Sequence, residues 1–252
     1  MTGDRLPPRS VLAEHVRDHL LESILLGRYA PDDRIVETHV ARELGTSQAP
    51  VREALRGLEA IGVVEISPFR GARVRRPSSR ELLEAYTVRS SLEALAARLA
   101  VPRMTDADID ELVGYGDAME AAARDHDGHG VAEADARFHG RIVALADNPT
   151  LQKVWRSLEP FSRTFITLVA PGADPEWSAH LHTPIIEALR RRDAEGVARA
   201  IEHHFTEASE NLARRWPDAT RGAGGRPSAP ARAGRSAAGR SAAGPTMPSG
   251  TR

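Results

Sequence analysis

An aspartate and several histidines are spaced along this chain in a way that suits a metal-binding site. Asp135 and His139 are one helical turn apart in the segment E-A-D-A-R-F-H-G-R-I, so a helix would aim a carboxylate and an imidazole at the same point. More histidines follow at His180, His182, His203 and His204. One Asp and three His that converge within a helical bundle could bind a divalent metal ion. Alternatively, these histidines lie on the surface or form hydrogen bonds in a core, and the residues alone favour this second interpretation.

The composition limits which chemistry is open to the protein. The chain has 252 residues and no cysteine. Disulfides, zinc ribbons, thiol nucleophiles and iron–sulfur clusters are therefore excluded, and any metal ion must be held by histidines and carboxylates. The N-terminus has no apolar run typical of a secretory signal, and no stretch approaches the roughly 20 uncharged apolar residues of a membrane helix. We therefore expect a cytoplasmic protein with no membrane partner.

Charge is distributed unevenly along the chain. Residues 1–77 carry 12 basic and 11 acidic side chains, residues 78–216 carry 16 basic and 23 acidic ones, and residues 217–252 carry 6 and 1. An acidic middle segment is unsuited to lie on phosphate groups. Any contact with nucleic acid is therefore expected in the N-terminal part, to which the Arg-rich tail could add.

The first 76 residues show the pattern of three helices followed by a β-hairpin. A helix is expected from a cap at Ser10 to Gly27, and a short one over 37–44. A third starts near Ser47 with Pro50 in its first turn, where no backbone N–H is required. The pattern then changes to strand-like alternation over 64–75, interrupted by a turn. Three helices plus a hairpin predict a winged helix-turn-helix.

The third helix has a face suited to reading DNA. Gln48 and Arg52 are four residues apart, and Arg can contact guanine while Gln can pair with adenine. Arg52 could equally belong to a solvated helix surface, but the hairpin that follows would form a wing and therefore favours DNA binding. The candidate DNA-binding residues on the two helices and the wing are Thr38, Ser47, Gln48, Ala49, Arg52, Arg70, Gly71 and Arg73.

The rest of the chain divides into a helical segment and a tail. Ser78 and Glu81 form a capping-box pattern that opens the helical segment, in which no strand pattern is found. Repeats of R-S-A-A-G in the tail cannot form a core and predict disorder. Helices are expected over 79–101, 105–123, 131–147 and 150–169, with two more between about 177 and 215. We therefore expect a DNA-binding domain over 1–76, an all-α antiparallel helical-bundle domain over 79–215, and a disordered tail over 217–252.

The N-terminal motifs resemble the GntR family of bacterial transcription regulators. The similarity covers about residues 11–75, and Gln48 and Ala49 depart from the Arg and Thr that are usual in the family at DNA-facing positions. The resemblance implies a winged helix-turn-helix that binds a short inverted repeat of double-stranded DNA as a homodimer. The matching positions are Ile24, Gly27, Pro31-Asp32, Ile35, Glu37, Val40-Ala41, Leu44-Gly45, Ser47, Pro50 to Leu55, Leu58, Gly62, Gly71 and Val74.

Residues 79–213 resemble the FCD effector-binding domain of the FadR-type subfamily. In that family D-x-x-F-H, a later E-H-x-x-I-x-x-A-L and a histidine on the last helix bind a metal ion. The resemblance implies that Asp135, His139, His182 and His204 are the ligands of a divalent zinc, nickel, manganese or iron ion. Around His182 the chain departs from the family, because Leu181 replaces the usual Glu and a proline follows at position 184, so a helix is expected to start near Thr183.

Arg89, in the first helix of this domain, is the candidate effector-binding residue. It could bind a carboxylate of a small organic acid with both arms of its guanidinium group, or it could be a surface residue paired with Glu93. The sequence thus predicts a ligand-responsive regulator, most simply a repressor, rather than an enzyme. Two alternatives remain: a second domain that only dimerises and binds no metal, and a metal-dependent hydrolase or lyase, for which no acid/base motif is found.

Overall fold

The computed structural model describes residues 9–169 and 174–215. The predicted tail over 217–252 lies outside these residues. Two separate hydrophobic cores are present, one formed by the N-terminal elements and one by the helices from residue 79 onward. Within the described segments, none of the helices is long and apolar enough to span a membrane.

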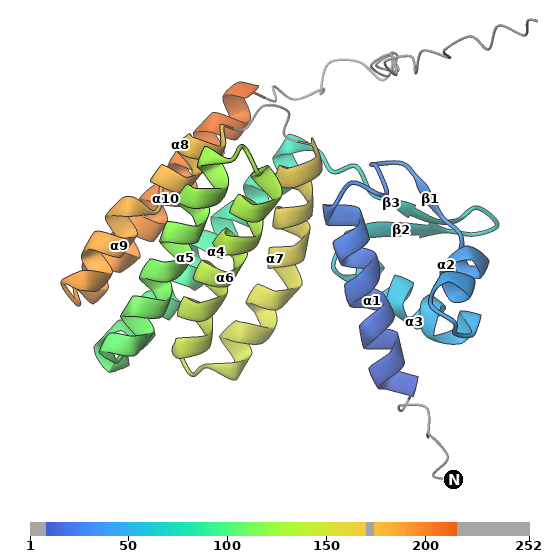
Figure 1. Cartoon of the computed structure of the whole chain (residues 1–252), viewed down its shortest axis with the longest axis horizontal. Helices are drawn as coiled ribbons and strands as arrows, with labels where there is room; N and C mark the ends of the chain where they lie inside the picture. The colour runs from blue at the N-terminus through green and yellow to red at the C-terminus, as the bar shows by residue number, and fades with distance from the viewer. Residues whose placement is uncertain (1–8, 170–173, 216–252) are drawn as a thin grey trace, which may run out of the picture. The chain divides into compact units, whose positions relative to one another are not determined.

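The N-terminal elements form the predicted winged helix-turn-helix, with α1 at Arg9–Leu25, α2 at Glu37–Glu43 and α3 at Gln48–Ala60 (Figure 1). Helix α1 begins at Arg9 rather than after a cap at Ser10, and Gly27 follows its end with a φ of 70°, which glycine adopts without strain. The apolar faces of the three helices meet in a core. It includes Val16, Leu20, Ile24, Val51, Leu55 and Leu58.

The wing is part of a three-stranded sheet, whereas the sequence predicted only a hairpin. Strands β2 (Val64–Ser67) and β3 (Gly71–Val74) form the expected antiparallel hairpin. Strand β1 (Arg34–Ile35) pairs with the other edge of β3, which gives the order β1-β3-β2. The prediction missed β1 because two residues are too few to show alternation, although Ile35 is buried in the core.

At the tip of the wing, the chain reverses through a strained turn. The amide N–H of Arg70 donates to the carbonyl oxygen of Ser67 over 3.1 Å. Phe69, inside this turn, has a φ of 64° and is fully exposed. Left-handed backbone costs a non-glycine residue about 1–2 kcal/mol, so this aromatic side chain is presented at an energetic cost.

The second core belongs to an all-helical bundle, as predicted (Figure 1). The predicted capping box of Ser78 with Glu81 opens the first helix, and a second capping box, of Thr105 with Asp108, opens the second. Three helices follow residue 174, where the sequence predicted two, because a break at Leu181 and His182 separates α8 from α9. The elements are α4 (Ser79–Ala100), a 3-10 turn (Val101–Arg103), α5 (Asp106–Arg124), α6 (Gly128–Leu145), α7 (Pro149–Val169), α8 (Pro175–His180), α9 (Thr183–Arg190) and α10 (Ala194–Arg215).

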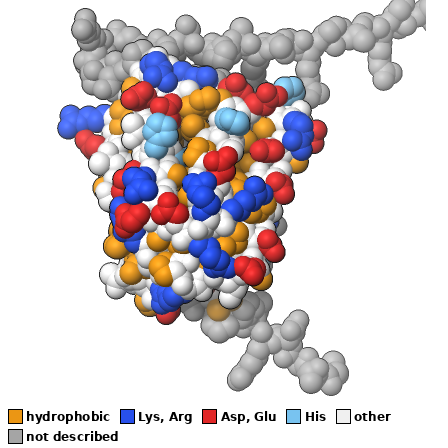
Figure 2. Space-filling model, turned by 90° about the vertical axis from the view of Figure 1, so that its left-hand side faces the viewer, with side chains coloured by type: hydrophobic (Ala, Val, Ile, Leu, Met, Phe, Trp, Pro, Cys, Tyr) orange, Lys and Arg blue, Asp and Glu red, His pale blue; other side chains and the backbone are white. Residues whose placement is uncertain are grey.

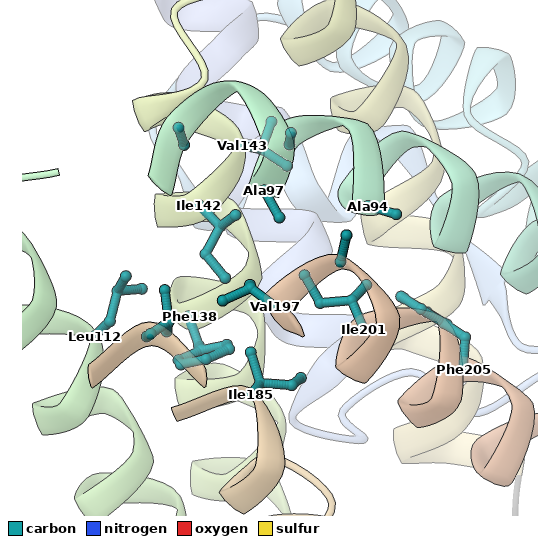
Figure 3. Close-up of a cluster of buried hydrophobic side chains, with 14 of the residues drawn as sticks. Ala94, Ala97, Leu112, Phe138, Ile142, Val143, Ile185, Val197, Ile201 and Phe205 are labelled. Atoms are coloured by element: carbon teal, nitrogen blue, oxygen red, sulfur yellow. The ribbon is translucent and has the colours of Figure 1, made fainter. Parts of the chain in front are cut away.

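Helix α4 is central to the bundle because it packs against α6, α7 and α10. Side chains from several helices interdigitate around Phe138, which is fully buried (Figure 3). Small residues on α4, such as Ala94 and Ala97, allow α10 to approach closely. On the face shown in Figure 2, acidic and basic side chains alternate with exposed hydrophobic ones. This mixture of charge is unlike the basic surface that lies on DNA.

Candidate metal centre and DNA-reading surface

The predicted DNA-reading residues lie on an exposed end of α3. Ser47 is the N-cap residue of the helix and makes no capping hydrogen bond with its side chain, so its hydroxyl group is available to other partners. Ser47, Gln48 and Arg52 are exposed, and Ala49 is half-buried. Thr38, near the start of α2, is exposed as well. The structure therefore presents polar side chains at the N-terminal end of the second helix of the helix-turn-helix, the part that contacts base edges in this motif.

Arg52 is held in place by two neighbours. Its Nε donates to Glu37 Oε2 over 2.7 Å, and its Nη2 donates to Gln48 Oε1 over 3.0 Å. Gln48 and Arg52 therefore share one face, as the spacing predicted. Glu37 was not predicted to belong to this face, although its place in the first turn of the neighbouring helix was a usable signal. A contact with a base can use the N–H groups of Nη1, which make no hydrogen bond to a described residue, without breaking either of these two.

The wing carries a second set of exposed basic groups. Arg70 and Arg73 are exposed, while Gly71 is half-buried with a φ of 77°. In the sheet Arg73 is flanked by Arg34 on β1 and by Glu65 on β2, and it also donates to the Asp32 carbonyl oxygen. Arg34 is a further candidate for phosphate contact that the sequence analysis missed, because it lies on the unpredicted strand.

In the bundle, the structure brings together the four residues implied as metal ligands. Asp135 and His139 lie on α6, His182 is the residue that caps the start of α9, and His204 lies on α10. One ligand atom from each lies within 4.8 Å of the others. The three histidines are buried and the aspartate is half-buried. The neighbouring His180 and His203, in contrast, are exposed.

The nitrogen–nitrogen distance and the shorter oxygen–nitrogen distance within this set match those between ligands of one ion, and the longer oxygen–nitrogen distance slightly exceeds them. Nε2 of His139 lies 3.2 Å from Nε2 of His182, and Asp135 Oδ1 lies 3.6 Å and 3.1 Å from these two nitrogens. Ligand bonds of about 2.1 Å at angles near 90–110° separate ligand atoms by about 3.0–3.4 Å. The break before α9 thus gives His182 a place in the set despite the altered sequence around it.

Contacts on the far side of two imidazole rings, hydrogen bonds for His182 and an ion-pair contact for His139, determine which nitrogens face the site. His182 Nδ1 lies 3.2 Å and 3.3 Å from the backbone carbonyl oxygens of Ser178 and Ala179, and His139 Nδ1 lies 2.5 Å from Glu93 Oε2. Because these partners accept, each Nδ1 carries a proton and donates it. The two Nε2 lone pairs then face one another at 3.2 Å, an arrangement that requires a cation, either a proton or a metal ion, between them.

His204 is the third imidazole of the set. Its Nδ1 is buried and has no hydrogen-bond partner among the described residues. Burial lowers the pKa of His204 well below its usual value, and His182 and His139 lower it further. The ring is therefore neutral near pH 7, which is the form that binds metal ions. An unpartnered neutral imidazole beside two lone pairs and a carboxylate fits a divalent cation.

Electrostatic interactions around His139 and Asp135 favour a cation. Burial lowers the pKa of His139, but Glu93 and Asp135 outweigh it and raise the pKa above its usual value. Burial would raise the pKa of Asp135, but His139 and His182 hold this pKa below its usual value. Asp135 is thus ionised near pH 7, and protons compete with metal ions for the set.

Arg89 and Glu93 form a buried ion pair next to the histidines. Arg89 Nε donates to Glu93 Oε1 over 2.9 Å, and both side chains are less than 5% exposed. The pairing with Glu93 was one of the two predicted alternatives, but the expected surface position was wrong. Burial would raise the pKa of Glu93, but Arg89 and His139 hold it below its usual value. The sequence analysis did not identify Glu93 as part of the site.

The fold and these two sets of residues define a class of protein: a winged-helix DNA-binding regulator with a second, all-helical domain. Residues 12–74 match the family described as bacterial regulatory proteins, gntR family, and residues 84–207 match the FCD domain. The chain belongs to the GntR family and is a bacterial transcription regulator of the type that carries an FCD domain. Because members of this family are regulators, the chain is not expected to be an enzyme.

Known relatives support this assignment over most of the chain. A Paenarthrobacter nicotinovorans protein, described as a probable D-xylose utilization operon transcriptional repressor, is 35% identical over 81% of this chain and 89% of its own. The transcriptional repressor RspR of Escherichia coli is 26% identical over 82% of this chain and 92% of its own. The solved structure of E. coli McbR/YncC has the same fold, with a TM-score of 0.72 at 22% identity over 81% of this chain and 98% of its own.

Proposed function

We propose that this regulator is a homodimeric, ligand-responsive repressor that binds a short inverted repeat of DNA. The exposed N-terminal end of α3, with Ser47, Gln48 and Arg52, is the observation that carries the proposal. Thr38 and Ala49 complete the face directed at the major groove, and the wing residues contact the backbone or minor groove. Repression is proposed because two relatives are described as repressors. A cytoplasmic location follows from a DNA target in a bacterium.

An apolar stripe on α4 supports the homodimer. Val88, Leu95 and Leu99 are exposed by 36–47% on the outer face of a helix whose other faces are packed inside the bundle. A two-fold axis between Ser91 and Leu92 would place Val88 opposite Leu95 of the partner subunit. The small Ser91 at the centre would allow two antiparallel α4 helices to approach closely. The stripe is therefore self-complementary, as an interface between identical subunits requires.

The dimer interface is tested by changing one residue of the stripe. Leu95→Glu places a charge in the proposed interface and should convert a dimer to a monomer in light scattering after size-exclusion chromatography. Val154→Glu, at an exposed apolar position on α7, is the matched control and should leave the dimer intact. A Leu95→Glu protein that remains dimeric would place the interface elsewhere.

In the bundle we propose that Asp135, His139, His182 and His204 hold one divalent metal ion. Three imidazoles and one carboxylate suit zinc, nickel, manganese or iron. The short distances between the facing lone pairs, together with the unpartnered Nδ1 of His204, support this proposal. When bound, the ion supplies a positive charge that can attract an anionic ligand.

Arg89 is proposed to bind the carboxylate of a small organic acid. Its pairing with Glu93 uses Nε, and no hydrogen bond from Nη1 or Nη2 to a described residue is present. These two groups are the ones that bind a carboxylate with two parallel hydrogen bonds. The ring centroids of Trp155 and Phe205 lie 5.8 Å and 5.1 Å from the guanidinium carbon, and the two rings hold the guanidinium group in place.

The competing function is a second domain that dimerises without metal or effector. Elemental analysis of the purified protein distinguishes the two functions, because the metal-site proposal requires about one ion per chain and the loss of that ion in Asp135→Ala.

Thermal-shift screening with organic acids and with D-xylose, named in the description of one relative, then tests the effector class. A ligand found this way should weaken binding to the protein's own upstream DNA. Failure to bind any genomic fragment at low salt would contradict the proposed DNA-binding function.

A further inference from the structure

Glu93 lies at a point where three helices of the bundle meet, two joined through hydrogen bonds to its carboxylate and the third through an ion-pair contact. It is 1% exposed and belongs to α4. Its Oε1 accepts from Arg89 Nε over 2.9 Å and from Trp155 Nε1, on α7, over 2.6 Å. Its Oε2 lies 2.5 Å from Nδ1 of His139, on α6. The two carboxylate oxygens therefore have different partners.

This division fixes the orientation of the carboxylate. Two N–H donors hold Oε1, and Arg89 is itself positioned against the ring of Phe205 at 5.1 Å. Rotation of the carboxylate would break both hydrogen bonds inside a core where neither donor could find water. Oε2 is consequently presented to His139 from one direction only, and the imidazole turns its Nε2 toward Asp135 and His182.

We propose that Glu93 is a positioning residue for the metal site, an inference that rests on the metal-binding proposal above. The carboxylate accepts the Nδ1 proton of His139 and so keeps the Nε2 lone pair directed at the other ligands. A carboxylate on the far nitrogen also makes an imidazole more basic and thereby a stronger ligand, and loss of such a partner typically weakens metal binding about 10–100-fold. Glu93 would act through His139 without touching the ion.

The test is Glu93→Gln, which preserves the shape of the side chain. Its carboxamide oxygen can still accept from Arg89 and Trp155, and its NH2 group then faces His139 Nδ1 and donates to it. The imidazole proton must move to Nε2, where it occupies the lone pair needed by the metal. We expect Ni²⁺ to bind about 10–100-fold more weakly in titration calorimetry of the full chain. In metal-free protein at alkaline pH, ¹⁵N NMR should show His139 protonated at Nδ1 in the wild type and at Nε2 in the variant.

Two further variants keep the inference testable. Glu111→Gln removes a different carboxylate that also holds α6, through a 2.8 Å hydrogen bond from Arg141 Nε, and should leave Ni²⁺ affinity unchanged. Trp155→Phe removes one of the two donors that fix Oε1 and retains the charge of Glu93, so it should weaken Ni²⁺ binding by less than Glu93→Gln. If Glu93→Gln fails to fold, a Trp155→Phe protein with the Ni²⁺ affinity of the wild type would overturn the positioning role.

The outcomes separate the two proposals. If the wild type does not bind Ni²⁺, the metal site itself is wrong, and the role of Glu93 is wrong with it. If the wild type binds Ni²⁺ and loses it in Asp135→Ala, the metal site stands. Equal affinity and an unchanged His139 tautomer in Glu93→Gln would then overturn the positioning role alone.

Discussion

The two candidate functional regions of this regulator each contain an ion pair of Arg and Glu, but one pair is exposed and the other is buried. On the DNA-reading face, Arg52 pairs with Glu37, and both side chains are more than one-third exposed. In the bundle, Arg89 pairs with Glu93, and both are less than 5% exposed. A solvated pair can exchange its partner for a base or a phosphate at little cost. A buried pair cannot separate without leaving an uncompensated charge, so it maintains geometry instead.

The largest expected effect comes from breaking the buried pair. Arg89→Met should lower the free energy of unfolding by about 3–5 kcal/mol, because Glu93 is left charged in the core with fewer partners. Arg52→Ala should lower it by less than about 1 kcal/mol, since its pair is exposed. Urea denaturation of the two variants gives both values. Equal losses would show that burial does not distinguish the two regions.

Metal loading should stabilise only the protein with an intact ligand set. At a free Ni²⁺ concentration of about 100 times the dissociation constant, the gain is about 2.7 kcal/mol, visible as a rise in melting temperature. In Asp135→Ala the rise should disappear. His203→Ala, at an exposed histidine next to His204, is the matched control and should retain it. Retention of the full rise in Asp135→Ala would exclude the aspartate as a ligand.

On the DNA-reading face, changes should affect binding more than folding. Arg52→Ala is expected to cost about 1–3 kcal/mol of affinity for the operator and to relax the preference at one base pair. Arg70→Ala, on the wing, should weaken binding to all sequences alike and lower the salt dependence. Fluorescence anisotropy with operator and scrambled DNA distinguishes the two patterns. An Arg52→Ala protein with unchanged sequence preference would remove Arg52 from base recognition.

At the strained wing tip, a substitution should raise the free energy of unfolding rather than lower it. Phe69→Gly relieves a φ of 64° at a fully exposed position and should raise the free energy of unfolding by about 0.5 kcal/mol, because part of the gain is offset by the entropy of glycine. Thermal denaturation measures this change. If the Phe69→Gly protein is more stable but binds DNA more weakly, the strained conformation of Phe69 serves contact with DNA. Loss of stability would show that the phenyl ring packs against the wing.

An effect of similarly small size concerns pH and the start of α4. Burial would raise the pKa of Glu81, but hydrogen bonds from Ser78 and the charge of Arg75 hold it below its usual value. The lowered pKa contributes stability that is present above about pH 4.5 and is lost as the pH falls through the folded-state value. Because Glu81 is about one-third exposed, the contribution should be below about 1 kcal/mol. Glu81→Gln keeps a capping box but not the charge, so its acid denaturation curve should be shallower than that of the wild type.

The two regions also differed in how well the sequence predicted them. The DNA-reading face depends on neighbours within one motif, so spacing alone placed Gln48 and Arg52 together. The capping box of Ser78 and Glu81 was likewise local and was predicted correctly. Strand β1 was missed because its only signal is pairing with β3, a contact between residues about 40 positions apart. Local patterns carry no information about such a pairing.

The site in the bundle could not be predicted from the spacing of its residues alone. Its proposed ligands come from α6, α10 and the start of α9, and only the resemblance to a family selected His182 and His204 over the neighbouring His180 and His203. Glu93 was missed because its link to His139 joins positions 46 residues apart on different helices. Its spacing from Arg89 predicted an ion pair but not burial, since periodicity on a largely buried helix does not show which polar residue points inward.

The hydrogen bond between Trp155 and Glu93 gives the protein its own optical reporter. The chain contains three tryptophans, and this one donates its indole N–H to the carboxylate that contacts a proposed metal ligand. Indole emission depends on the charge and polarity around the ring. Binding at the site should therefore alter the intrinsic fluorescence of Trp155, so that unlabelled protein can be titrated with metals and metabolites directly.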